Sequence, residues 1–406
     1  MRKQILTLVA LLIGNISPAL AQAPLQPSQV KFSPKSGIGV IAPDSLFSLN
    51  LRFRIQNRAI YYSNPQPGFS QAESDFELRV RRLRLRFEGF MLSPKLTYLV
   101  QLSFSRGDMD WSVRDNSAIN SSPNVVRDAV IYYRPTPQLQ LFFGQTKLPG
   151  NRQRVISSGD QQFVDRSIVN VAFNIDRDFG FQAHYTNHVG RFYYIIKSAL
   201  TSGEGRNVIM TNDGLAYTGR LELLPLGKFT NEGDYFEGDL EREEKPKLSL
   251  AGGLSHNRKA RRSGGQIGRD LYEERNMRTY IFDGLLKYQG LAVYAEHMAR
   301  SADNPFTQNT SGDLQHIVTG NGQNYQVSYI FKNNLEVASR YARVSPAAAI
   351  REVEQQEETY TAGVTKYLRR HRVKLQGNIS YITFTHLPTN TNSDTWSAAL
   401  QFELGI

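Results

Sequence analysis

The chain has 406 residues, a formal net charge of +11 at neutral pH and no cysteine. The lack of cysteine excludes disulfides and metal or redox sites built from thiolates. Beyond the N-terminus, no stretch of about 18 residues is apolar enough for a membrane-spanning helix, which excludes helical membrane proteins. The positive charge indicates anionic partners, but it does not distinguish nucleic acids from small anions.

The N-terminus has the pattern of a secretory signal. Two basic residues precede an apolar run over residues 5–13, and Ala-Leu-Ala at 19–21 has the small-x-small form of a cleavage site. We therefore predict a signal peptide over residues 1–21, because the apolar run is too short to span a membrane. Residues 22–44 contain proline and glutamine and are predicted to form an irregular arm. An exported chain is not expected to bind nucleic acid.

The first long amphipathic segment covers residues 45–61. Side chains of a strand point alternately to opposite faces, so alternation of period two predicts a strand with two unlike faces. One face is apolar and carries Phe47, Leu49, Leu51, Phe53, Ile55, Ala59 and Tyr61, and the other is polar and basic and carries Ser48, Asn50, Arg52, Arg54, Gln56 and Arg58.

The next strand, over residues 76–87, repeats this scheme with more arginine. Its phase slips by one residue at Arg81-Arg82, as a β-bulge makes it slip. The apolar face then carries Phe76, Leu78, Val80, Leu83, Leu85 and Phe87, and the basic face carries Arg79, Arg81, Arg82, Arg84 and Arg86. Two neighbouring strands would thus place guanidinium groups on one side and apolar groups on the other.

Such a sheet fits two settings, a soluble β-protein with a solvated face or a transmembrane barrel with lipid outside and an anion path inside. The connections distinguish them. From residue 45 onward about sixteen strand-like runs follow one another, and short and long connections alternate almost throughout, as in an up-and-down barrel with short periplasmic turns and long external loops. A β-sandwich does not sort its connections in this way.

The last amphipathic run, residues 396–406, continues to the final residue and suits closure against the first strand. We therefore predict an all-β fold over residues 45–406, a transmembrane antiparallel up-and-down β-barrel. It would lie in the outer membrane of a Gram-negative bacterium with lipid as one partner.

One connection, residues 225–246, is acidic. It could bind a divalent cation, but it lacks the ordered spacing of a calcium loop, so a solvated periplasmic turn is the preferred prediction. No spacing groups serine, histidine and aspartate as a catalytic set, and the seven histidines form no tight cluster. The sequence therefore predicts no enzyme, no cofactor and no metal site.

Four ordered motifs between residues 144 and 180 resemble the phosphate-selective porin O/P family. They are Gly-Gln-Thr-Lys-Leu-Pro at 144–149, Ser-Ser at 157–158, Phe-Val-Asp-Arg-Ser at 163–167 and Arg-Asp-Phe-Gly at 177–180. Asp165 stands where glutamate is usual in that family. The arginine-rich second strand and Gly-Asp-Tyr-Phe at 233–236 resemble the family as well.

This resemblance implies a sixteen-stranded, trimeric outer-membrane porin. It also implies that the long third loop, residues 146–178 by position, folds into the lumen, where arginines and lysines line a path for small anions such as phosphate. Lys147 matches the motif lysine at the start of that loop, and Arg166 matches the motif arginine near its end. Arg152 and Arg154 lie in the loop without a motif match.

Guanidinium groups stay ionised and fit phosphate or carboxylate oxygens. The candidates for lining the anion path are Arg52, Arg54, Arg58, Arg79, Arg81, Arg82, Arg84, Arg86 and Lys147, and those for the constriction loop are Arg152, Arg154, Asp165 and Arg166. The alternative is that the arginines pair with lumen carboxylates and only hold the wall together, the acids in question being Glu88, Asp128, Glu222, Asp283 and Glu296.

Two functional hypotheses remain open. The first is a passive channel selective for anions of the phosphate or polyphosphate type. The second is a general porin, or a plugged barrel that serves binding or assembly rather than transport.

Overall fold

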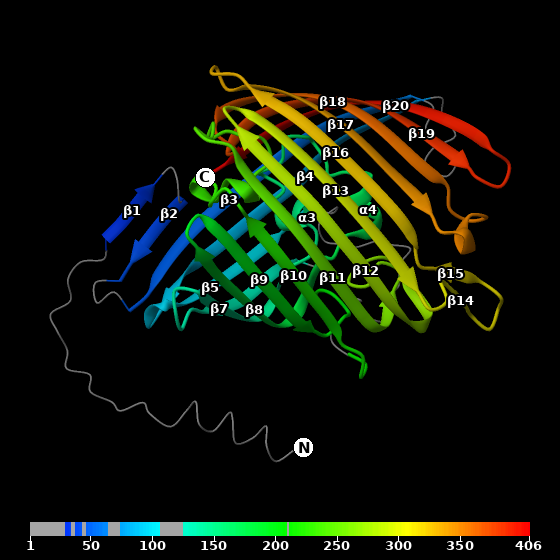
Figure 1. The fold of residues 1–406 in the computed structure, drawn as a ribbon, viewed down its shortest axis with the longest axis horizontal. Helices are drawn as coiled ribbons and strands as arrows, with labels where there is room; N and C mark the ends of the chain where they lie inside the picture. Colours follow the sequence, from blue (N-terminus) through cyan, green and yellow to red (C-terminus); the bar gives the residue numbers. More distant parts are fainter. Residues whose placement is uncertain (1–28, 34–36, 43–45, 64–73, 106–124, 209–210) are drawn as a thin grey trace, which may run out of the picture.

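The computed structural model describes residues 29–33, 37–42, 46–63, 74–105, 125–208 and 211–406. The predicted signal peptide lies outside the described residues. Sixteen antiparallel strands, β3 to β13 and β16 to β20, form a barrel that closes where β20 pairs with β3 (Figure 1). This confirms the predicted all-β barrel. No helix among the described residues is long and apolar enough to cross a membrane.

The strands of the wall are β3 Ser48–Ser63, β4 Ser74–Met91, β5 Ser93–Ser103, β6 Val126–Tyr133, β7 Leu139–Lys147, β8 Arg177–Val189, β9 Phe192–Thr201, β10 Ala216–Leu224, β11 Lys247–Arg262, β12 Asp270–Tyr288, β13 Leu291–Ala302, β16 Gly320–Ile330, β17 Leu335–Pro346, β18 Gln356–Arg369, β19 Val373–His386 and β20 Thr391–Gly405. The remaining elements are β1 Gln29–Ser33, β2 Gly37–Ile41, the hairpin β14 Phe306–Gln308 and β15 Leu314–His316, the helices α3 Arg152–Val155 and α4 Ile168–Phe173, and the 3-10 turns η1 Thr230–Tyr235 and η2 Ala348–Ile350.

The predicted phase slip in β4 is a β-bulge. Gln56 of β3 lies opposite Arg82 and Asn57 lies opposite Val80, so Arg81 is the extra residue. On the outer face Leu78 is 69% exposed, whereas Arg82 on the inner face is 3% exposed. The bulge therefore keeps apolar side chains outside and arginines inside along the whole strand.

The segment predicted to be an irregular arm contains two strands in its described part. β1 and β2 form a hairpin, and β2 pairs with residues 48–51 of β3, just beyond the point where the pairing with β20 ends at Arg54 (Figure 1). β3 extends past β20 at this end, so its backbone groups there would otherwise have no strand partner. β2 supplies these hydrogen bonds, and the structure differs here from the predicted irregular arm.

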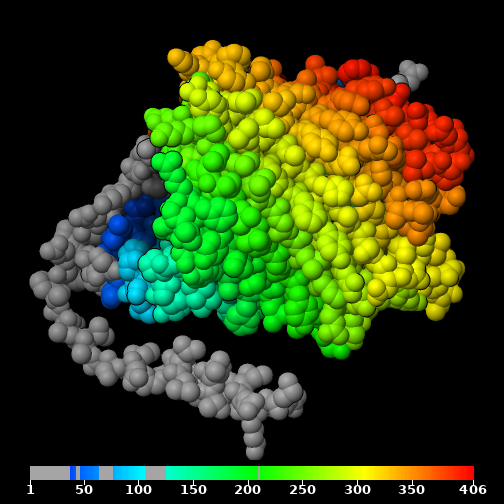
Figure 2. Space-filling view, in the orientation of Figure 1, coloured from blue at the N-terminus to red at the C-terminus, as the bar shows by residue number. Residues whose placement is uncertain are grey.

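A row of aromatic side chains crosses the outside of the barrel. They lie in direct register on β16 to β20, with the rings of Tyr381 and Trp396 4.8 Å apart. The row comprises Tyr325, Tyr341, Tyr360, Tyr381 and Trp396, and the next outward row on the loop side is polar and comprises Gln323, Arg343, Glu358, Thr383 and Asp394. Aromatic girdles of this kind mark the edge of the apolar band of a membrane barrel. On the face in view in Figure 2, the side chains of β9 to β13 form a continuous outer wall.

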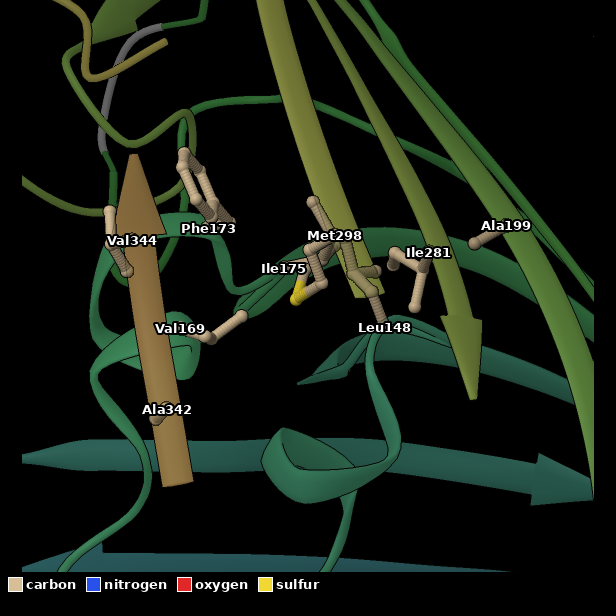
Figure 3. Packing of buried hydrophobic residues seen from close by; sticks show 9 residues of the cluster. All are labelled: Leu148, Val169, Phe173, Ile175, Ala199, Ile281, Met298, Ala342 and Val344. Atoms are coloured by element: carbon tan, nitrogen blue, oxygen red, sulfur yellow. The ribbon is translucent and has the colours of Figure 1, made fainter. Parts of the chain in front are cut away.

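The main apolar core lies inside the barrel. Residues 148–176, which connect β7 to β8 and are called the constriction loop below, fold into the lumen with α3 and α4 (Figure 1). Val169 and Phe173 of α4 are fully buried and belong to one cluster with Ile281, Met298 and Ala342 of the wall (Figure 3). This packing fixes the loop against β12, β13 and β17 and confirms that the third long loop enters the lumen.

Candidate permeation site

The inner faces of β3 and β4 bring arginines directly opposite one another. The facing pairs are Arg52 with Arg86, Arg54 with Arg84, and Arg58 with Arg79. Like charges in such positions repel each other, so the pairs require counter-charges or hydrogen-bond acceptors. The structure supplies these from two sources, the constriction loop and carboxylates of the wall.

The inward-facing arginines of β3 and β4 are called the arginine face below. The middle of this face binds the tip of the constriction loop. Arg54 donates to the hydroxyls of Ser157 at 3.1 Å and Ser158 at 2.7 Å, and Arg84 donates to Ser158 at 3.0 Å. Gln56 donates to the carbonyl of Ser158 at 3.1 Å. The Ser-Ser motif is thus the point where the loop is attached to the basic wall.

Asp165 gathers three guanidinium groups at the same wall. It accepts a hydrogen bond from Arg58, and its Oδ1 lies 3.6 Å from Arg81 and 3.7 Å from Arg82. Asp165 belongs to the loop and not to a spanning strand. Burial raises the pKa of its carboxyl, but Arg81, Arg58 and Arg82 outweigh burial and hold the pKa below its usual value. Asp165 is therefore ionised at neutral pH and neutralises part of the arginine face.

The ends of the arginine face are more open. Arg52 and Arg86 share Glu88 at 2.6 and 2.5 Å, with side chains that are 36% and 38% exposed, and Arg79 pairs with Glu77 at 2.8 Å and is 42% exposed. Arg58, Arg82 and Arg84 are less than a tenth exposed. The predicted set therefore divides into buried arginines that hold the loop and exposed arginines that an ion in the lumen can reach.

The basic residues in and next to the constriction loop also include both partly exposed and buried side chains. Lys147 donates to the carbonyl of Val155 at 2.6 Å, and Arg166 donates to the carbonyls of Gln153 and Ile156 at 2.7 and 2.9 Å. The acceptors of these bonds are carbonyls and not carboxylates, and both side chains are partly exposed, as is that of Arg154, which pairs with Asp176.

Arg152, in contrast, is 1% exposed. It bonds Asp283 and Ser249 of the wall, both at 2.7 Å, and the carbonyl of Asp234 at 2.9 Å. Arg152 is therefore a buried anchor of the loop.

The wall opposite the arginine face is closed by a buried ion network. Arg220 pairs with Glu222 and Asp283, each at 2.6 Å, and Lys197 pairs with Glu222 at 3.0 Å. Sequence reasoning missed Lys197 and Arg220, although the inward parity of β9 and β10 could have identified them. The lumen thus has one side filled with paired charges and one side with exposed arginines.

The carboxylates proposed as alternative partners of the arginine face mostly pair elsewhere. Of the five acids proposed, Glu88 contacts that face. Asp128 pairs with Arg177 at 2.9 Å, and Glu296 accepts the hydroxyl of Tyr294 at 2.8 Å. Pairing therefore does hold much of the arginine face, and the partners come both from the constriction loop and from wall carboxylates such as Glu77 and Glu88.

The acidic connection, residues 225–246, is not the solvated turn that was predicted. Asp234, Glu237, Asp239 and Glu243 are each less than a tenth exposed. Glu237 accepts hydrogen bonds from the constriction loop, Asp239 accepts one from Gly290, and Glu243 accepts from Thr230 of the same connection. Among the described residues no group of acids and histidines is arranged to hold a metal ion.

Comparison with known proteins gives a family and a fold. The family model described as phosphate-selective porin O and P matches residues 49–231. No curated protein matches the chain.

Three solved structures have the same fold at low sequence identity. An anion-selective porin from Comamonas acidovorans is 12% identical, with a TM-score of 0.53 over 89% of this chain and 100% of that one. The outer membrane channel DcaP of Acinetobacter baumannii is 11% identical, with a TM-score of 0.55 over 89% and 97%. The trimer form of OmpT, an outer membrane protein of Vibrio cholerae, is 9% identical, with a TM-score of 0.52 over 88% and 99%.

Proposed function

Because the chain is an outer-membrane porin of the phosphate-selective porin O and P family, we propose that it forms a passive channel selective for small anions, phosphate among them. The observation that carries the proposal is the exposure of Arg52, Arg79 and Arg86 on an inner face that also holds buried arginines. A cationic wall repels cations and replaces part of the hydration of a passing anion.

The path follows from the distribution of charge. The side of β9 to β12 is filled by buried pairs, whereas Arg52, Arg79 and Arg86 of β3 and β4 are exposed, and Lys147 of β7 and Arg154 and Arg166 of the constriction loop are partly exposed. An anion passing between these two surfaces meets guanidinium and ammonium groups from both sides. This arrangement supports selectivity by charge together with a narrow cross-section.

The proposal is tested by replacing Arg52, Arg79 and Arg86 with glutamine. We expect the protein to fold, because polar substitutions on a wet lumen face are tolerated. Anion-over-cation permeability should fall on the order of threefold to tenfold at low salt, because these charges act directly on the passing ion. The measurement is the reversal potential across a planar bilayer, in chloride and in phosphate.

Salt dependence and a matched triple control complete this test. The Debye length is about 8 Å at 0.15 M and about 3 Å at 1 M, so most of the difference should vanish near 1 M. Arg258, Arg278 and Arg343 lie on the outward parity of β11, β12 and β17, so their replacement removes the same charge outside the pore and should leave selectivity unchanged. Equal loss of selectivity in both triples would refute the path along β3 and β4.

A plugged barrel that serves binding or assembly is the second candidate, because two inserted segments fill part of the lumen. Ion flux distinguishes the two. Steady single-channel currents from the purified protein support a channel, whereas their absence, with folding verified by circular dichroism, supports the plugged barrel.

We also propose that the protein is a homotrimer. The resemblance to the porin family supports this assembly, and the matched OmpT structure is described as a trimer form. Native mass spectrometry in a mild detergent should give a mass three times that of the mature chain. A monomer that persists across several detergents would contradict the proposed assembly.

A further inference from the structure

The connection between β10 and β11, residues 225–246, is called the periplasmic segment below because it starts and ends at the end of the barrel with the short turns. It turns inward. Phe229 is 5% exposed and packs against Leu224, Leu285 and Tyr294, which face the barrel interior. Further along, the Tyr235 hydroxyl donates to Glu222 at 2.7 Å. The segment therefore fills the lumen below the constriction loop on the side of β9 to β13.

Glu237 of this segment contacts the constriction loop at three points. Its carboxylate accepts the backbone N–H of Gln162 at 3.0 Å and the side-chain amide of Gln153 at 3.2 Å. Its own N–H donates to the carbonyl of Asp160 at 2.9 Å. These partners are uncharged, so Glu237 acts as a directional hydrogen-bond acceptor, and a charged acceptor makes stronger bonds than a neutral one.

The same stretch of the loop is held by the wall from another side. Lys374 donates to the carbonyl of Gln161 at 2.6 Å, and Thr365 and Gln376 donate to the carbonyl of Gln162 at 2.9 and 3.0 Å. The wall therefore satisfies the carbonyls of residues 161–162, while Glu237 satisfies the N–H of Gln162. A buried N–H without an acceptor is costly, so loss of Glu237 favours a shift of the loop toward another acceptor or water.

The periplasmic segment is itself fixed to the rim of the barrel. Lys287 donates to the carbonyls of Gly233 and Phe236 at 2.6 and 2.8 Å. Asp239 accepts the N–H of Gly290 at 2.7 Å, and Arg242 donates to the carbonyl of Ile330. The segment thus connects the short turns to the constriction loop by hydrogen bonds at both of its sides.

We propose that the periplasmic segment supports the constriction loop from below, and that Glu237 is the positioning residue that sets the free cross-section of the pore. The effect on selectivity rests on the proposed anion channel, whereas the effect on cross-section does not. An acidic segment in a basic pore is then explained by hydrogen-bond geometry, because its carboxylates are used to hold backbone N–H groups.

The direction in which loss of Glu237 changes anion selectivity distinguishes this proposal from a simple effect of removing one negative charge. By charge alone, removing a carboxylate from the lumen raises the anion preference. Release of the loop widens the path between the cationic surfaces and lowers the anion preference instead. Glu237→Ala and Glu237→Gln remove the same charge, but glutamine keeps an oxygen that accepts the N–H of Gln162.

We expect Glu237→Ala to raise single-channel conductance by about twofold, because conductance grows with the free cross-section, and to lower the anion preference. Glu237→Gln should stay close to the parent in both readouts. Glu244→Ala removes an exposed acid of the same segment and should change neither. If Glu237→Ala and Glu237→Gln behave alike, or if both raise the anion preference, the support role is wrong.

Thiol labelling tests the position of the segment without relying on the Glu237 variants. The parent has no cysteine, so single cysteines can be introduced at Asp234, which is 6% exposed, and at the exposed Glu244. In the folded channel, the cysteine of Asp234→Cys should react about tenfold more slowly than that of Glu244→Cys, because reactivity requires access of the reagent. Equal rates would mean a solvated turn and would overturn the proposal.

The two proposals fail in different ways. A parent channel without anion preference refutes the proposed function. In that case the conductance of Glu237→Ala against Glu237→Gln still reports whether the segment supports the loop, since cross-section is measured without reference to ion charge.

Discussion

Replacing Asp283 with asparagine is expected to destabilise the barrel by about 3–5 kcal/mol, the cost of removing one partner from a buried ion pair. Asp283 lies between two guanidinium groups, at 2.7 Å from Arg152 and 2.6 Å from Arg220, and the side chains of all three are at most 1% exposed. Arg220 keeps Glu222, whereas Arg152 keeps the hydroxyl of Ser249, one carbonyl and the ring of Tyr235. A buried charge is then left without a carboxylate.

The measurement is equilibrium unfolding in urea, in detergent micelles or lipid vesicles. Replacing Arg152 by methionine in the Asp283→Asn protein should cost less than the same change in the parent, because the two side chains act on each other. The control is Glu273→Gln, which removes the acid from an exposed pair with Arg275 and should cost about 0–1 kcal/mol. An Asp283→Asn barrel as stable as the control would show that this network does not hold the constriction loop.

The barrel could be predicted because its physical cause is local. Alternation of period two is set by the geometry of a strand, and in β4 it holds on each side of the bulge. The bulge at Arg81 could also be predicted, because a single extra residue exchanges the faces to which all later side chains of the strand point. The pairing of β2 with β3 was harder to see, because it depends on how far β3 extends past β20, which is a tertiary fact.

The roles of the arginines could be predicted only in part. Parity places Arg54 and Arg86 on the same inner face, but it does not show that Arg54 meets Ser157 and Ser158 while Arg86 stays open to the lumen. That difference depends on where the constriction loop lies. Glu237 illustrates the same limit, because an acid that binds a buried backbone N–H looks in the sequence like an acid in water.

Leu85→Arg is expected to cost roughly 2–4 kcal/mol, the cost of an arginine facing lipid near the bilayer midplane. Leu85 lies close to the middle of β4, and its neighbours on β3 and β5 are Phe53 and Leu102, so its surroundings are apolar on both sides. The same substitution at Leu78, toward the outer end of the strand, should cost only about 0–1 kcal/mol, because the side chain reaches the interface. Unfolding in urea in lipid vesicles measures both.

The stability of Leu85→Arg tests directly whether the bulge at Arg81 turns Leu85 toward the lipid. Without an extra residue at Arg81, Leu85 would face the lumen and Arg84 the lipid, and an arginine at position 85 would be tolerated as one more lumen cation. Leu85→Met keeps the apolar character and should cost less than about 1.5 kcal/mol, which separates the effect of charge from that of shape. Leu85→Arg should also leave the reversal potential of the molecules that fold unchanged, because its charge lies outside the pore. A stable Leu85→Arg barrel with a stronger anion preference would place that side chain in the lumen and reverse the facing of β4 beyond residue 81.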